Sequence, residues 1–104
     1  MANKVKILAP RKAIVIDSKD NVATALVELP KTEVVVVEIG DDKLDIMLLE
    51  NIFAGHKFAL RDLKIGGPVI KYGETIGLAT ANILPGQLVH VHNVEGTRGR
   101  GDKQ

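Results

Sequence analysis

The sequence contains no cysteine and no tryptophan. Without cysteine the chain has no disulfide, no thiolate metal site and no cysteine nucleophile. Aromatic residues make up only 3% of the 104 residues, namely Phe53, Phe58 and Tyr72. We therefore expect a core of Val, Ile, Leu and Ala. We expect no basic surface carrying the aromatic rings on which nucleic acid bases stack.

A strong charge of one sign is also lacking. The chain has 14 Lys and Arg residues and 13 Asp and Glu residues, a formal net charge of +1, so no strong field favours nucleic acid or a membrane as partner. No apolar run approaches the ~20 residues of a membrane span. The charged start of the chain is not followed by the long apolar segment of a signal peptide. We expect one domain, because a chain of this length makes about one domain. Without a membrane span or a signal peptide, we expect it in the cytoplasm.

Short β-rich segments follow one another along the chain. Glu33–Ile39 contains four consecutive valines, and we interpret it as a strand buried on both faces, because β-branched side chains suit a pleated sheet. The turn Gly40-Asp41-Asp42 joins it to Lys43–Leu49 and predicts a β-hairpin. Further strands are predicted at Lys12–Asp17, His56–Leu60, Val69–Lys71, Thr75–Thr80 and Leu88–His92. The pattern predicts an all-β domain.

One segment has the spacing of a helix. Its apolar residues recur at i, i+3, i+4 and i+7, one face of a short helix: Val22, Ala25, Leu26 and Leu29. Asp20 or Asn21 would be the N-cap, and Pro30 would end the helix. The expected fold is therefore mainly β with one or two short helices.

A weak internal repeat links these segments. Leu63–Val69 and Ile83–Val89 share an apolar residue, two spacers, Gly, two spacers and Val, and Leu29–Val35 is a looser copy with Thr in place of Gly. This pattern predicts a tight turn that leads into a strand, with a positive φ at the Gly position.

The composition changes at Gly96. Residues 97–104 contain no apolar side chain, so they cannot join a core. We expect a domain over residues 1–95 and a flexible tail rich in Gly and Arg over residues 96–104.

The three histidines are His56, His90 and His92. On the predicted strand, His90 and His92 would point to one face, with Val89 and Val91 directed into the core. Two imidazoles on one accessible face could bind a divalent metal or form an acid–base pair. They could equally be two solvated side chains.

Several cations adjoin glycines. His56 and Lys57 follow Gly55 at a strand start, where they could bind a carboxylate or simply begin the strand. Lys71 and Tyr72 could donate hydrogen bonds to an anionic substrate, although a hairpin turn also explains them.

Five segments, taken in order, resemble the N-terminal part of altronate dehydratases. They are Asp20–Leu26, Gly55–Leu60, Val69–Gly73, Ile76-Gly77 and His90–Asn93. Galactarate dehydratase and the small subunit of sulfolactate sulfo-lyase share much of this set. The resemblance implies a SAF-type domain, similar to antifreeze-like domains, with a β-clip fold.

The resemblance also implies a reaction. A sugar acid such as altronate would lose a proton from C2 and hydroxyl from C3, giving a 2-keto-3-deoxy acid. It implies a divalent metal, ferrous iron being the expected ion, held mainly by a separate large catalytic subunit, so that this chain alone would be inactive. The catalytic candidates are His56, His90 and His92, of which His90 and His92 are also metal-ligand candidates. The substrate-binding candidates are Lys57, Lys71, Tyr72 and Asn93.

Alternatives stay open. The chain could be the small subunit of a sulfolactate sulfo-lyase or of a galactarate dehydratase-like enzyme. It could also be a non-catalytic β-clip module that binds a partner or a sugar acid without chemistry. Neither nucleic acid nor a membrane is expected as a partner, and a homo-oligomer is a further alternative.

Overall fold

The computed structural model describes residues 11–97. Every element between Ala13 and Gly96 is a strand. The bounds are β1 Ala13–Ile14, β2 Val22–Ala25, β3 Val34–Ile39, β4 Asp42–Met47, β5 Lys57–Ala59, β6 Pro68–Lys71, β7 Glu74–Ala79, β8 Leu88–Val89 and β9 Val94–Gly96. The all-β prediction is confirmed. Within the same range no helix has the length and hydrophobicity of a membrane span.

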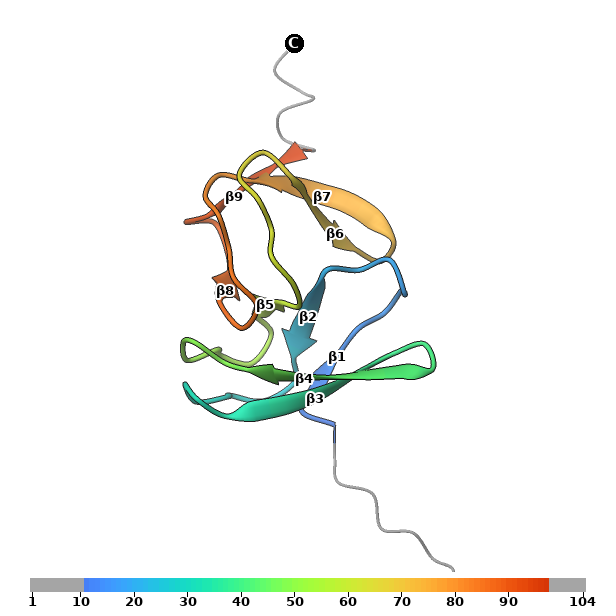
Figure 1. Ribbon diagram of the computed structural model, residues 1–104. Coiled ribbons are helices and arrows are strands. Elements are labelled where there is room, and N and C mark those ends of the chain that lie inside the picture. Colours follow the sequence, from blue (N-terminus) through green and yellow to red (C-terminus); the bar gives the residue numbers. More distant parts are fainter. Residues whose placement is uncertain (1–10, 98–104) are drawn as a thin grey trace, which may run out of the picture.

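The strands form three small antiparallel sheets (Figure 1). The middle sheet has the order β1-β2-β5-β8. The β3–β4 hairpin covers one of its faces, and the sheet β6-β7-β9 covers the other. The middle sheet is therefore buried on both faces, although its strands are short.

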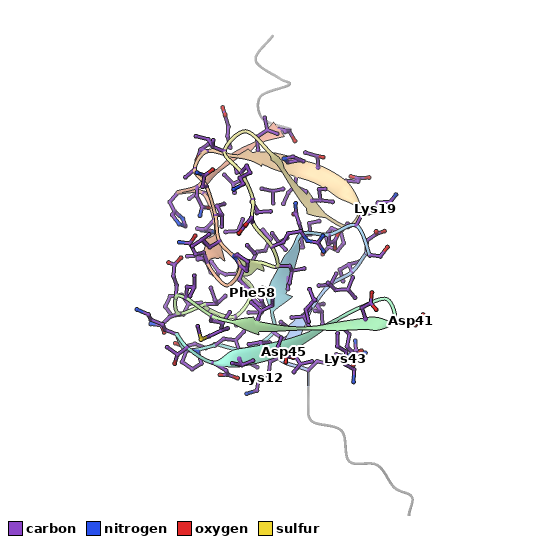
Figure 2. The ribbon with its side chains drawn as sticks, in the orientation of Figure 1. Lys12, Lys19, Asp41, Lys43, Asp45 and Phe58 are labelled. Carbon is purple, nitrogen blue, oxygen red and sulfur yellow. The ribbon has the colours of Figure 1, made fainter. Side chains whose placement is uncertain are left out.

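Neighbouring residues of β5 enter different cores. Phe58 packs with Val35, Val37 and Leu48 in the core under the β3–β4 hairpin, where it lies at the centre of the molecule (Figure 2). Ala59 packs in the second core, under β6 and β7. Because successive side chains of a strand point to opposite faces, one strand can supply both cores.

The predicted repeat appears in the structure as equivalent backbone pairing in the two halves of the domain. In the first half, Leu29 and Ile52 exchange two backbone hydrogen bonds of 2.8 Å. In the second half, Leu63 and Ile83 exchange two backbone hydrogen bonds of the same length. All four side chains are buried. The structure adds a fourth copy of the repeat, Ile52–Phe58, which has Phe in place of Val.

Side-chain hydrogen bonds show the same correspondence between the two halves of the domain. Asn51 Oδ1 accepts a hydrogen bond from the Lys31 amide at 2.8 Å, and Asn82 Oδ1 accepts one from the Ile65 amide at 2.8 Å. The predicted positive φ is confirmed at Gly66 and Gly86, which have φ of 84° and 88°. The looser copy has it too, at Thr32, where φ is 76°.

The predicted helix over residues 22–29 is wrong. Val22–Ala25 is strand β2, and Asp20 and Asn21 do not cap a helix. A short strand that is buried on both faces is apolar at successive positions, so its spacing imitates one helical turn. Pairing with β1 and β5 decides in favour of the strand.

The prediction that the valine strand is buried on both faces is also wrong. Val35 and Val37 are buried, but Val34 and Val36 are 55% and 54% exposed. The β3–β4 hairpin is an outer layer with only one face on the core, so alternate valines point to solvent.

The expected tail begins at Gly96, the last residue of β9, which pairs with Gly77 of β7. The rest of that tail, from Arg98 onward, lies outside the described residues. The boundary of the domain stays a prediction.

Candidate functional site

Two of the three histidines lie together. The ring centroids of His56 and His90 are 4.7 Å apart, and the rings are tilted by 49°. His56 precedes β5 and His90 follows β8, and the pairing of Lys57 with Val89 brings these strand ends side by side. His56 is half-buried, whereas His90 is exposed.

The His56 ring also has a backbone neighbour. His56 Nδ1 lies 3.4 Å from the Ala54 carbonyl oxygen, to which only a protonated nitrogen can donate. A hydrogen bond here requires a proton on Nδ1.

The predicted strand over Leu88–His92 is wrong beyond Val89. Residues 90–93 form a turn, and Val91, expected in the core, is 81% exposed. The buried Asn93 side chain imposes the turn. Its Oδ1 accepts from the His90 amide at 2.9 Å and its Nδ2 donates to the Leu88 carbonyl at 2.8 Å. The inference that a strand places His90 and His92 on one face is therefore lost, and His92 is exposed in the turn.

Phe53 is a neighbour of the histidines that the sequence did not point to. Its ring meets that of His56 edge-on, with centroids 6.1 Å apart and an interplanar angle of 67°. Phe53 is 59% exposed. The repeat gives a signal for this exposure, because Phe53 and Leu84 occupy equivalent positions. Each directly follows a buried isoleucine, Ile52 or Ile83, and Leu84 is likewise 52% exposed.

A second group contains the predicted cations. Burial lowers the pKa of the half-buried Lys57 ammonium, and the positive charge of Lys71 lowers it further. Lys71 Nζ lies 4.7 Å from the centre of the Tyr72 ring. Among residues 11–97 the ion pairs are Arg11–Glu38 and Lys12–Glu33, so the structure gives neither Lys57 nor Lys71 an acidic partner there.

The turn that carries Lys71 and Tyr72 is fixed from the other half of the chain. Tyr72 and Gly73 both have positive φ, 58° and 74°, as in the two-residue turns that suit twisted hairpins. The buried carboxylate of Asp20 accepts from the Gly73 amide at 2.8 Å. Figure 1 shows this β6–β7 turn beside the loop between β1 and β2.

Asn21 continues this link. Its Nδ2 donates to the Pro68 carbonyl at 2.9 Å, and its Oδ1 accepts from the Ile70 amide at 2.8 Å. The residues expected to cap a helix therefore hold the β6–β7 hairpin against β2. They thereby position the substrate-binding candidates Lys71 and Tyr72.

The metal expectation can be tested against the donors present. Within residues 11–97 no group of three His, Asp or Glu side chains could hold a metal ion. His56 and His90 supply two nitrogens, fewer than a divalent metal centre requires. The described part of this chain therefore does not provide a complete metal site.

Comparison with known proteins agrees with this architecture. A family model described as Altronate/galactarate dehydratase SAF domain matches residues 11–97. The altronate dehydratase of Escherichia coli is 47% identical over 80 residues, which cover 77% of this chain and 15% of that protein. The altronate dehydratase of Bacillus subtilis is 37% identical over 82 residues, which cover 79% of this chain and 16% of that protein.

A third relative is a shorter protein. The (2R)-sulfolactate sulfo-lyase subunit alpha of Chromohalobacter salexigens is 43% identical over 58 residues, which cover 56% of this chain and 62% of that subunit. The chain thus spans about a sixth of the altronate dehydratases and less than two thirds of the sulfo-lyase subunit.

Proposed function

Because the chain belongs to the altronate/galactarate dehydratase SAF domain family, we propose that it serves a hydro-lyase that dehydrates a sugar acid such as D-altronate. In this proposal it is the small SAF part and works with a larger catalytic subunit. The observation that carries the proposal is the 47% identity to an altronate dehydratase over most of this chain.

The chemistry gives the paired groups their roles. The reaction removes a proton from C2, beside the carboxylate, and hydroxide from C3, and the enol so formed becomes a 2-keto-3-deoxy acid. The imidazoles of His56 and His90 are suited to take the C2 proton and pass it to the departing hydroxide, which leaves as water, because an imidazole can both accept and donate a proton. His92 remains the third candidate.

The cations are suited to the substrate carboxylate. Lys57 and Lys71 repel each other in the free protein, and an anion between them would relieve that repulsion. The Tyr72 hydroxyl could add a hydrogen bond. The amide of Asn93 already holds the His90 turn, and its contact with substrate stays a prediction.

The divalent metal implied by the resemblance, with ferrous iron the expected ion, stays part of the proposal. We assign its ligands to the larger subunit, since the described residues do not complete a site. A cytoplasmic location is likewise proposed.

A sulfo-lyase role is the second candidate. The relation to a sulfolactate sulfo-lyase subunit alpha favours it. The chemistry is parallel, because both reactions would remove a proton next to a carboxylate and expel an anion from the adjacent carbon. The same histidines and lysines would serve either substrate.

The test is reconstitution. The full chain is mixed with the large catalytic subunit, and 2-keto acid formation is measured with D-altronate, galactarate and (2R)-sulfolactate. We expect turnover of one sugar acid by the mixture and none by the chain alone. Turnover of sulfolactate only would establish the second candidate. A complex that forms but converts none of the three would indicate a non-catalytic binding module.

A further inference from the structure

Exposed apolar side chains lie on both sides of the histidine pair. The Phe53 ring contacts His56, the His56 ring contacts His90, and Val91 follows His90 in the turn. Phe53 is 59% exposed and Val91 is 81% exposed. We call these four residues the Phe53–Val91 surface.

The backbone under this surface is fixed. Gly55 has a φ of 85°, and its amide donates to the Ala25 carbonyl at 2.8 Å, which secures the turn that carries Phe53. Asn93 secures the turn that carries His90 and Val91. A surface built from fixed turns loses little conformational entropy when a partner covers it.

We propose that the Phe53–Val91 surface is where the large catalytic subunit docks, so that the histidine pair is enclosed in the interface. This proposal rests on the proposed function. It deepens that function by naming the interface. The partner it requires presents an apolar pocket that accepts Phe53 and Val91, because aromatic anchors in pockets dominate such interfaces.

The relatives support this occupant. The region like this chain is 15% of the Escherichia coli altronate dehydratase and 16% of the Bacillus subtilis protein. A domain of this kind therefore occurs in one chain with a much larger body, which is the occupant that we propose for one of its faces. The face that carries His56 and His90 is favoured, because a subunit docked there would also exclude water from the two imidazoles.

A second exposed apolar group is less suited. Val34, Val36 and Met47 lie on the outer face of the β3–β4 hairpin, beside a groove of about 390 Å³. Lys12 and Lys43 line this groove, and Figure 2 shows both at the far side of the hairpin from β6 and β7. The ion pairs Arg11–Glu38 and Lys12–Glu33 already join its two walls.

The test measures affinity for the large catalytic subunit by calorimetry, with the full chain and its variants. Phe53→Ser and Val91→Ser are the test variants. Val36→Ser is the matched control, since it makes the same change at an exposed valine on the other face. We expect Kd to rise about 10-fold or more for each test variant and to stay within about twofold for the control.

A second readout locates the contact. Carbethoxylation of histidines, followed by mass spectrometry, should show His56 and His90 protected in the complex and reactive in the free chain. A complex that binds the test variants as tightly as the wild type, or that leaves both histidines reactive, would overturn the proposal. Absence of any complex, or a dimer of this chain that Val91→Ser dissociates, would overturn it too.

The two proposals fail separately. A complex that needs Phe53 and Val91 but converts no substrate would retain the docking surface and contradict the lyase function. A complex that is active but indifferent to both substitutions would retain the function and contradict the docking surface.

Discussion

The Asp20 carboxylate accepts a hydrogen bond from the Gly73 amide at 2.8 Å, across 53 positions of sequence. Its other oxygen accepts from the amides of Ile16 and Asp17, at 3.3 and 3.1 Å. One buried side chain thus joins the start of the middle sheet to the turn that carries Lys71 and Tyr72. Asp20 and Gly73 both lie in motifs through which the sequence resembles altronate dehydratases.

Replacing Asp20 by Ala should therefore destabilise the domain strongly. The substitution leaves three partly buried backbone amides without their acceptor. A net hydrogen bond contributes about 0.5–1.5 kcal/mol, because water replaces part of the lost interaction at such amides. We expect the free energy of unfolding in urea to fall by about 3 kcal/mol, whereas Asp41→Ala, at an exposed turn residue, should change it by less than about 0.5 kcal/mol. Equal effects of the two substitutions would contradict this role of Asp20.

Asn93 should have a comparable role at the histidine turn. Asn93→Ala removes one acceptor and one donor and leaves the His90 amide and the Leu88 carbonyl unpaired. We expect a loss of about 1–3 kcal/mol in the free energy of unfolding. His92→Ala, in the same turn but exposed, is the control. A stable Asn93→Ala protein with an unchanged His90 environment by NMR would show that other contacts hold the turn.

The strands that the sequence predicted best are those set by local chemistry. The valine-rich β3 and its partner β4 were found because β-branched residues and a Gly-Asp turn specify a hairpin locally. The turn pattern predicted positive φ at Gly66 and Gly86 for the same reason. Strand β2 was misread because its burial on both faces arises from pairing with β1 and β5 and from the cores on each side, and none of these is encoded within the segment.

The arrangement of the candidate site residues was predicted only in part. Sequence analysis named His56, His90, Lys57 and Lys71 as candidates. It paired His90 with His92, because residues two positions apart on a strand point to the same face. The actual pair, His56 with His90, depends on the two residue pairs between β5 and β8. Such tertiary pairing has no signal in the spacing of either histidine.

Two positive-φ glycines should respond differently to alanine. At Gly55 an added Cβ would meet no atom within 4 Å, so Gly55→Ala should cost only the backbone strain of about 1–2 kcal/mol. At Gly86 the Cβ would lie 2.1 Å from the Met47 carbonyl oxygen. We expect Gly86→Ala to cost about 3 kcal/mol or more, since strain and overpacking add. Thermal unfolding compares the two, and a higher Tm for Gly86→Ala than for Gly55→Ala would contradict the packing.

Lys57 should make stability depend on alkaline pH. Its pKa in the folded protein is lowered from 10.5 by burial and by Lys71. Between the lowered pKa and 10.5 the unfolded chain binds more protons than the folded one, so the free energy of unfolding should rise with pH in that range. Lys57→Gln should flatten this rise, while Lys19→Gln, at an exposed loop residue, should not. Denaturant titrations across the alkaline range measure both, and identical slopes for wild type and Lys57→Gln would refute the effect.

The histidine pair should matter for turnover more than for folding. His56→Gln and His90→Gln each keep a polar side chain at a site that is not fully buried, so stability should change by only about 0.5 kcal/mol. In the complex with the large catalytic subunit, we expect at least one of them to lower kcat by roughly 10²-fold or more, the scale of lost general acid–base catalysis.

The double variant should then be little worse than the more damaging single one, because two imidazoles that pass one proton act as a unit. His92→Gln tests the pairing itself, since a loss of kcat confined to that variant would make His92 the proton carrier in place of the His56–His90 pair, whose rings are 4.7 Å apart. Steady-state kinetics with the accepted substrate decides, and normal turnover by all three variants would make this domain a scaffold.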